Sequence, residues 1–177
     1  KEKRGLSDGA IRRFGLGYAP DEFGGLLHYL RRRGFADVEI EDGGLAKRSA
    51  KGNLYDLFRH RVMVPIIDVR GNIIAFGGRV MDDSKPKYIN SPETLVYKKS
   101  RTLFALNLAK KSASKRYILC EGYMDVISMH EAGFDTAVCA CGTALTPEQV
   151  KLLSEYAEEA VLSYDSDEAG QKATARS

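Results

Sequence analysis

Hydrophobic positions in the last third of the chain fall into short runs that are separated by stretches of helical period. The runs predict three strands, at 117–120, 136–140 and 160–164. Helical patterns lie between them at Tyr123–Ala132 and from Pro147, with Thr146 as N-cap, to about Ala157, and a third helix is expected from Asp167. Apolar strands that alternate with helices predict a parallel sheet with right-handed crossovers.

The first two thirds of the chain mix helical and strand patterns without regular alternation. Helices are expected over Asp21–Arg33, ended by Gly34, and over Ser100–Lys111 with Ser100 as N-cap. The β-branched runs Arg61–Asp68 and Asn72–Val80 flank a glycine-containing turn and predict a hairpin. The fold class is therefore α/β (α+β overall), with an α+β subdomain at 1–115 and a Rossmann-like parallel sheet at 116–177.

Charge divides the chain at nearly the same place. Residues 1–116 hold 24 Lys and Arg against 13 Asp and Glu, whereas residues 117–177 hold 3 against 11. A basic part joined to an acidic part predicts binding of a polyanion beside a cluster of carboxylates.

Overall composition limits the class of protein. With 44% hydrophobic and 29% charged residues, we expect a globular chain. No apolar run approaches the length of about 18 residues that a membrane span needs, and no apolar stretch follows the first charged residues as in a secretion signal. The cysteines Cys120, Cys139 and Cys141 lie in apolar runs without metal-ligand spacing, so we expect reduced core thiols and no zinc site.

Acidic residues follow two of the predicted parallel strands. Glu121 and Asp125 come after the first strand, and Asp165 and Asp167 come after the third. Because ligands bind at the carboxyl ends of parallel strands, these acids predict a site for Mg²⁺ or Mn²⁺, which prefer oxygen ligands. The alternative is that Asp165 and Asp167 cap a helix and that Glu121 is a solvated loop residue.

Cations and polar residues gather between positions 59 and 101. Arg59 and Arg61 are expected to share one strand face, and Gly77-Gly78 before Arg79 permits close backbone approach. Cations near extended backbone, with an aromatic ring and an amide, suit a nucleic-acid groove. The candidate residues are Arg59, Arg61, Arg79, Lys87, Tyr88, Asn90, Lys98, Lys99 and Arg101. A solvated charged surface is the alternative. For Arg31–Arg33, the dipole of a helix end is at least as good an explanation as a nucleic-acid contact.

The chain resembles the RNA-polymerase domain of bacterial DnaG-type primases over essentially its whole length. The motifs are RGLSDGAIRRFGLGYAP at 4–20, YDLFRHRVMVPI at 55–66, FGGRVMDD at 76–83, PKYINSPET at 86–94, EGYMDVISMHEAG at 121–133, CGTALTPEQ at 141–149 and YDSDEAGQKA at 164–173. The last motif alone indicates only the broader Toprim fold, which topoisomerases and some nucleases share. PKYINSPET followed by EGYMDV is what favours a primase.

The resemblance implies template-directed synthesis of short RNA primers on single-stranded DNA by a nucleotidyltransferase. It assigns the Toprim metal acids to Glu121, Asp165 and Asp167, with Asp125 beside them. It matches the candidates listed above, except Lys98, to positions associated with template, nucleotide or primer phosphates. Lys87 and Lys99 match the lysines tied most closely to activity, and Asn90 matches a position associated with single-stranded template. It also implies a bacterial cytoplasmic replisome setting, with NTPs, an RNA primer, a replicative helicase and single-strand-binding protein as partners, and no membrane.

Two departures from the family pattern matter. The usual glycine between the paired aspartates is Ser166. The chain also ends in the helix after the third strand, so the expected Toprim part at 116–177 is incomplete, and the family's later acidic motif, zinc-binding domain and helicase-interaction domain lie outside it. We therefore expect weak or no priming from this chain alone. Another Toprim enzyme, or a non-catalytic binder of single-stranded DNA, remains the alternative.

Overall fold

The structure is a computed structural model, and it describes residues 5–141 and 145–164. It separates into two compact units. Unit 1 comprises Lys1–Phe14, Ile66–Ile74 and Lys98–Ser177, and unit 2 comprises Gly15–Pro65 and Ala75–Tyr97. Because both units are built from separate stretches of chain, they do not follow the expected division near residue 115. That division stays a prediction about the family's subdomains.

A four-stranded sheet is the centre of unit 1, in the order β10-β8-β9-β7. The strands are β7 (Leu103–Phe104), β8 (Arg116–Cys120), β9 (Ala137–Ala140) and β10 (Glu159–Ser163). The central strand β8 runs parallel to both β9 and β10, whereas β7 is antiparallel to β9. The three predicted strands and their parallel arrangement are confirmed, with ends that move by one residue.

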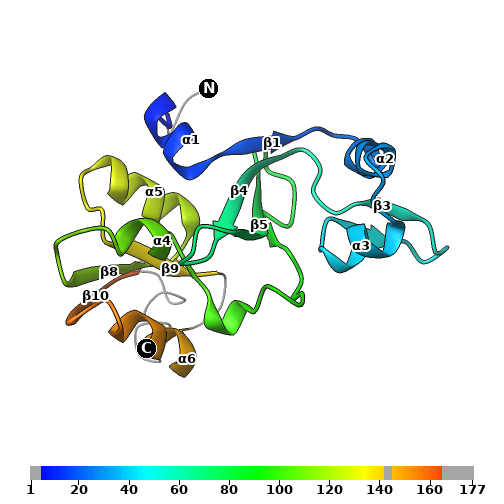
Figure 1. Cartoon of the computed structure of the whole chain (residues 1–177). Helices are drawn as coiled ribbons and strands as arrows, with labels where there is room; N and C mark the ends of the chain where they lie inside the picture. The colour runs from blue at the N-terminus through cyan, green and yellow to red at the C-terminus, as the bar shows by residue number, and fades with distance from the viewer. Residues whose placement is uncertain (1–4, 142–144, 165–177) are drawn as a thin grey trace. The chain divides into compact units, whose positions relative to one another are not determined.

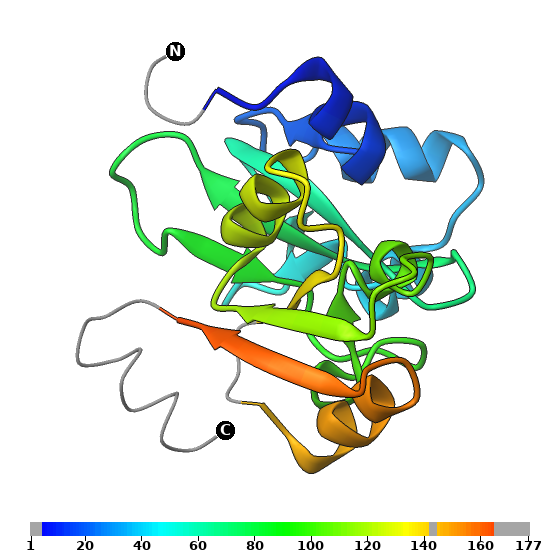
Figure 2. The same cartoon turned by 90° about the vertical axis from the view of Figure 1, so that its left-hand side faces the viewer.

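Helices cover both faces of this sheet. The helix α5 (Tyr123–Glu131) lies on one face and α6 (Pro147–Ser154) on the opposite face (Figures 1 and 2). The helix α4 (Leu106–Ala109) and α6 both contribute side chains to one buried cluster. This cluster consists of Leu103, Leu106, Ala109, Tyr117, Leu119, Val138 and Leu153. Thr146 caps α6 as predicted, because its hydroxyl accepts from the Gln149 N–H, but the helix ends at Ser154 instead of near Ala157.

The helix expected over Ser100–Lys111 is wrong. This stretch forms the short 3₁₀ turn η1 (Lys99–Arg101), then β7, and only then the one-turn helix α4. Ala105 has a φ of 65°, in the left-handed region, so a continuous helix cannot pass through it. The two residues of β7 instead pair with Ala140 and Cys139 at the edge of the sheet. Tertiary pairing here overrides a local helical pattern.

An antiparallel sheet in the order β1-β4-β5-β6 lies mainly in unit 2. Its strands are β1 (Gly17–Ala19), β4 (Arg61–Ile67), β5 (Ile73–Val80) and β6 (Tyr88–Asn90). The predicted hairpin is confirmed, since β4 and β5 are neighbours and the turn between them is closed by an Asp68 N–H bond to the Asn72 carbonyl.

The rest of unit 2 is a smaller layer with its own core. It contains α2 (Gly25–Arg32), α3 (Asp37–Asp42) and the hairpin of β2 (Ala46–Arg48) with β3 (Leu54–Asp56). Leu27, Ile40 and Ala46 are buried together between these elements. Unit 1 further holds the short helix α1 (Asp8–Phe14). Among the described residues, no helix combines the length and apolar character that crossing a membrane requires.

The start of α2 differs from the prediction for a long-range reason. Asp56, which is 4% exposed, accepts the Leu26 and Leu27 N–H groups at 2.8 and 2.9 Å. This carboxylate caps the helix from thirty residues away, so α2 begins at Gly25 and not at Asp21. The end agrees with the prediction: Gly34 has a φ of 91° and its N–H bonds to the Arg31 carbonyl.

Candidate nucleic-acid interface and metal-binding acids

In unit 2, Arg61 is held inside the protein. Its side chain is 8% exposed and donates to the Pro86 carbonyl at 2.9 Å and to the Gly78 and Lys87 carbonyls at 3.4 Å. Burial lowers the pKa of this guanidinium, and the charge of Arg59 lowers it further. Arg61 thus anchors the segment that carries Lys87, and a direct phosphate contact by Arg61 stays a prediction.

Gly78 leaves space for the Arg61 side chain, because it has no Cβ atom. A Cβ atom there would lie 2.8 Å from the Phe58 ring and 3.0 Å from Cδ of Arg61, so the position has room only for glycine unless these side chains shift. Close approach at Gly78 was expected from the sequence. The groups that approach are the protein's own side chains.

Arg59 lies among aromatic rings. Its guanidinium carbon is 4.6 Å from the ring centre of Phe23 and 5.1 Å from that of Tyr55, and it donates to the Asp56 carbonyl. Because the intervening His60 has a φ of 50°, the backbone is not extended between Arg59 and Arg61. The two guanidiniums accordingly contact different partners, and the expected shared strand face does not form.

The β5–β6 pair brings together four of the predicted residues. Arg79 stands opposite Tyr88 and donates to its hydroxyl at 3.0 Å, and Lys87 Nζ lies 5.9 Å from the centre of the same ring. Asn90 stands opposite Gly77 at the other end of this pairing. An aromatic ring that is 38% exposed and flanked by two cations suits base stacking beside phosphate contacts.

In unit 1, Lys98, Lys99 and Arg101 share one short segment, Lys98–Thr102, which we call the cation turn. Lys98 and Arg101 are exposed and Lys99 is half-buried. Gln149 Nε2, on α6, donates to the Lys99 carbonyl at 2.9 Å and to the Thr102 carbonyl at 2.8 Å. Sequence reasoning missed this support, because local patterns do not link positions about fifty residues apart.

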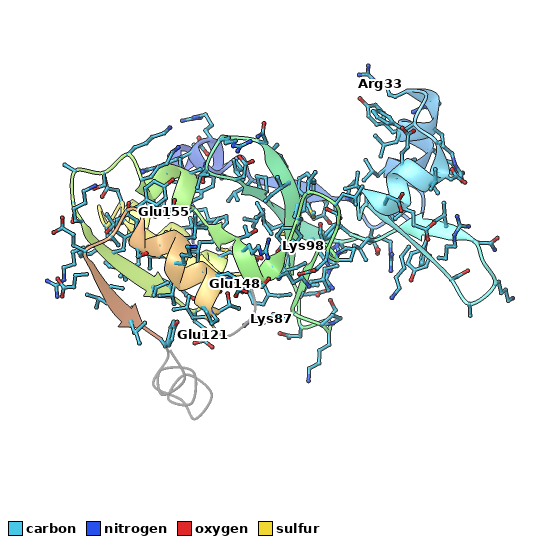
Figure 3. The ribbon with its side chains drawn as sticks, turned by 60° about the horizontal axis from the view of Figure 1, so that its bottom comes forward. Arg33, Lys87, Lys98, Glu121, Glu148 and Glu155 are labelled. Carbon is cyan, nitrogen blue, oxygen red and sulfur yellow. The ribbon has the colours of Figure 1, made fainter. Side chains whose placement is uncertain are left out.

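Glu121 is exposed directly after β8, in the same unit (Figure 3). The pairing of Cys120 with Ser163 makes β8 and β10 end side by side. Asp125 lies in the first turn of α5 and its Oδ2 accepts the Gly122 N–H at 3.1 Å, which caps the helix. The predicted acids Asp165 and Asp167 lie outside the described residues.

The side chains available as metal ligands here suit a hard divalent cation better than zinc. The described residues contain no group of three or more His, Cys, Asp or Glu side chains that could hold a metal, so Glu121 and Asp125 would need further acids. All three cysteines are buried free thiols, and burial raises the pKa of Cys120 to about 11. Carboxylate oxygens, not thiolates, are therefore the available ligands, which favours Mg²⁺ or Mn²⁺.

A cavity of about 540 Å³ lies elsewhere in unit 2. Tyr18, Tyr29, Phe58 and Phe76 give it largely apolar walls. None of the predicted site residues that the structure describes lines it, so this cavity is not part of the candidate site.

Unit 1 also contains a buried histidine outside the candidate site. His130 is 4% exposed and its Nε2 lies 2.9 Å from the Ala137 carbonyl, whereas Nδ1 has no hydrogen-bond partner among the described residues. Burial lowers the pKa of this imidazole and the charge of Arg13 lowers it further, against the opposing effects of the hydrogen bond to the Ala137 carbonyl and of Asp135. The net effect is a lowered pKa, so folding disfavours the protonated form of His130.

This histidine should make unfolding depend on pH. With a folded pKa below the unfolded value of about 6.5, the unfolded chain takes up the proton first, so stability is fully present above that pH and falls as pH drops toward the folded pKa. Urea unfolding at pH 7.5, 6.5 and 5.5 should show this loss, and His130→Gln should reduce it. An equal loss in the variant would contradict the assignment.

Comparison with known proteins identifies the parts of the chain. A Toprim-like family model matches residues 118–177 and the model for the N-terminal domain of the DNA primase catalytic core matches residues 1–110. The first match defines the class of fold that carries Glu121, and the second covers every basic candidate. The chain belongs to the DNA primase catalytic core family.

Relatives agree with this assignment. The DNA primase of Clostridium acetobutylicum is 49% identical over 98% of this chain and 29% of its own length. A DNA primase domain from Pseudomonas aeruginosa superposes with a TM-score of 0.90 at 42% identity, covering 98% of this chain and 55% of that one. A DnaG primase catalytic domain bound to single-stranded DNA gives 0.86 at 39% identity, covering 97% and 56%. The chain thus spans less than a third of the length of this curated relative.

Proposed function

We propose that this chain takes part in template-directed synthesis of RNA primers on single-stranded DNA, as a nucleotidyltransferase of the primase type. The observation that carries the proposal is an exposed Glu121 at the carboxyl end of the parallel strand β8, in a chain whose residues 1–110 match the primase catalytic-core model and whose residues 118–177 match a Toprim-like model. Carboxyl ends of parallel strands are where such sheets bind their ligands.

We infer that Glu121, Asp165 and Asp167 hold the divalent cations, Mg²⁺ or Mn²⁺, with Asp125 beside them. Support comes from the described residues: β10 ends two positions before Asp165 in the sequence, and its register with β8 brings the two strand ends together. A bound divalent cation supplies stabilisation of the charge that develops on the transferring phosphoryl group. The half-buried Asp125 contributes at least the cap that orders the first turn of α5 behind Glu121.

The basic residues have the roles of binding and orientation. Lys87, Arg79 and Tyr88 offer two cations around an exposed ring, and Asn90 adds an amide for a base edge. Arg59 offers a guanidinium stacked on rings, and the cation turn offers Lys98, Lys99 and Arg101. Holding template and triphosphate in register lowers the entropic part of the barrier. No side chain needs to act as a general base in this scheme.

The partners follow from the same assignment. They are single-stranded DNA as template, NTPs as substrates and the growing RNA primer, at the bacterial replisome in the cytoplasm. Helicase and single-strand-binding protein would contact parts of the longer relatives that this chain does not match.

The test is a primer-synthesis assay on single-stranded DNA with labelled NTPs and Mg²⁺ or Mn²⁺. It is run on this chain and on a completed catalytic domain, in which the chain is joined to the remaining domain of the Clostridium acetobutylicum relative. We expect metal-dependent RNA products from the completed domain and a much lower yield from the chain alone. Cleavage of the DNA would instead identify a topoisomerase or nuclease, and binding without any product would identify a non-catalytic binder.

A further inference from the structure

The motif CGTALTPEQ at 141–149 has no role in the function proposed above, although two of its residues, Thr146 and Gln149, make hydrogen bonds to the backbone around Lys99. Gln149 is completely buried, with 0% of its surface exposed. A buried amide is costly unless its donors and its acceptor all have partners, and here both donors are directed to the same short segment of backbone.

The contacts converge on the backbone of the cation turn. Gln149 Nε2 donates to the carbonyls of Lys99 and Thr102 at 2.9 and 2.8 Å. Thr146 Oγ1 donates to the intervening Ser100 carbonyl at 2.6 Å. Three of the five carbonyls of the segment are therefore fixed from α6.

The two donors also fix one another. Gln149 Oε1 accepts the Thr146 N–H at 3.0 Å, and Thr146 Oγ1 accepts the Gln149 N–H at 3.2 Å. A further hydrogen bond inside the cation turn, from Thr102 Oγ1 to the Lys98 carbonyl at 2.8 Å, joins the first and last residues of the segment. The capping box of α6 and the cation turn thus form one hydrogen-bonded assembly.

A short 3₁₀ turn with three cationic side chains is not expected to be stable in one conformation by itself, because like charges repel and such turns have poor hydrogen-bond geometry. With its carbonyls bonded to α6, the backbone from which these side chains project has a single arrangement. Preorganised cations bind a polyanion better than mobile ones, since less side-chain and backbone freedom is lost.

We propose that Gln149 and Thr146 are positioning residues, which hold the cation turn so that Lys98, Lys99 and Arg101 meet the phosphates of bound nucleic acid. This proposal rests on the proposed function, because it requires the cation turn to bind DNA. It adds residues of α6 that touch neither DNA nor nucleotide and act through the backbone of the turn.

A double-mutant cycle on this chain tests the proposal. The affinity for a fluorescein-labelled single-stranded oligonucleotide is measured for the wild type, for Gln149→Met, for the triple variant Lys98→Ala/Lys99→Ala/Arg101→Ala, and for the four changes together. Methionine keeps the length and helix preference of glutamine and removes both donors. Glu148→Gln, which lies on the exposed side of the same helix (Figure 3), is the matched control.

We expect Gln149→Met to weaken binding about tenfold in the wild-type background and less than about twofold in the triple variant, because coupled residues are not additive. The salt dependence of binding should move toward that of the triple variant, since fewer phosphate contacts release fewer counterions. Glu148→Gln should behave as the wild type. Equal losses from Gln149→Met in both backgrounds would overturn the proposal, because a purely structural effect does not depend on the cations.

A second pair of variants covers the case in which Gln149→Met lacks a cooperative unfolding transition. Thr146→Ala loses the bond to Ser100, whereas Thr146→Ser keeps a hydroxyl that can make it; the first should weaken binding in a cation-dependent way and the second should restore it. Thr146→Ala that binds as the wild type would overturn the proposal. If the triple variant binds DNA as tightly as the wild type, a different claim is contradicted. That result would show that the cation turn does not bind DNA, which is part of the proposed function.

Discussion

Glu121→Gln should reduce primer synthesis by the completed catalytic domain about a hundredfold or more, while the protein stays folded. The change keeps the shape of the side chain and removes the charge that a divalent cation needs, and metal stabilisation of developing charge is worth several kcal/mol, or about tenfold for each 1.36 kcal/mol. Asp165→Asn and Asp167→Asn should have effects of the same order. The measurement is the initial rate of RNA product formation at saturating NTP and Mg²⁺.

Glu155→Gln is the control for this experiment. Glu155 is an exposed acid at the end of α6, in the same unit as Glu121 and with the same charge (Figure 3). If Glu121→Gln and Glu155→Gln lower the rate equally, general electrostatics accounts for the loss and the metal-site assignment is wrong.

Lys87→Ala and Lys99→Ala should each weaken binding of single-stranded DNA or nucleotide about tenfold, because each removes a charge-assisted contact. For DNA, each lost phosphate contact should lower the magnitude of the slope of log affinity against log salt by about 0.7. Titrations of a labelled oligonucleotide at four salt concentrations give both quantities. Lys87 lies in the segment that Arg61 anchors, and Lys99 lies in the segment that Gln149 anchors.

Arg31→Ala is the control for these lysines. The Arg31 side chain is 42% exposed, but its Nε donates to Asp37 Oδ1 at 2.7 Å, so the adjacent carboxylate already balances its charge. We expect a slight loss of stability and a smaller loss of binding. Equal binding losses for Arg31→Ala and the lysine variants would show that diffuse positive charge, without a defined interface, binds the DNA.

The part of the fold predicted best from sequence is the part governed by local patterns. The strands β8, β9 and β10 are continuous apolar runs, and Thr146-Pro147 is a strong start signal for α6. Ser100–Lys111 looked equally helical. The conformation of this segment depends on strand pairing with β9 and on hydrogen bonds from α6. Neither can be predicted from the local sequence.

The candidate site divides in the same way. The positions of Glu121 and Tyr88 follow from strand ends and strand pairing, which the sequence indicates. The burial of Arg61 and the stacking of Arg59 depend on residues up to 36 positions away, Phe23 among them. The sequence alone does not show whether a basic side chain is solvated, stacks on an aromatic ring or donates to a backbone carbonyl.

The most direct test of the central claim is a crystal of the completed catalytic domain soaked in Mn²⁺ and measured at a wavelength where manganese scatters anomalously. The account predicts an anomalous peak within coordination distance of the Glu121 carboxylate and at least one of Asp165 and Asp167, and its loss in Glu121→Gln crystals. A manganese peak held by other acids, with none at Glu121 under conditions that support primer synthesis, would contradict it.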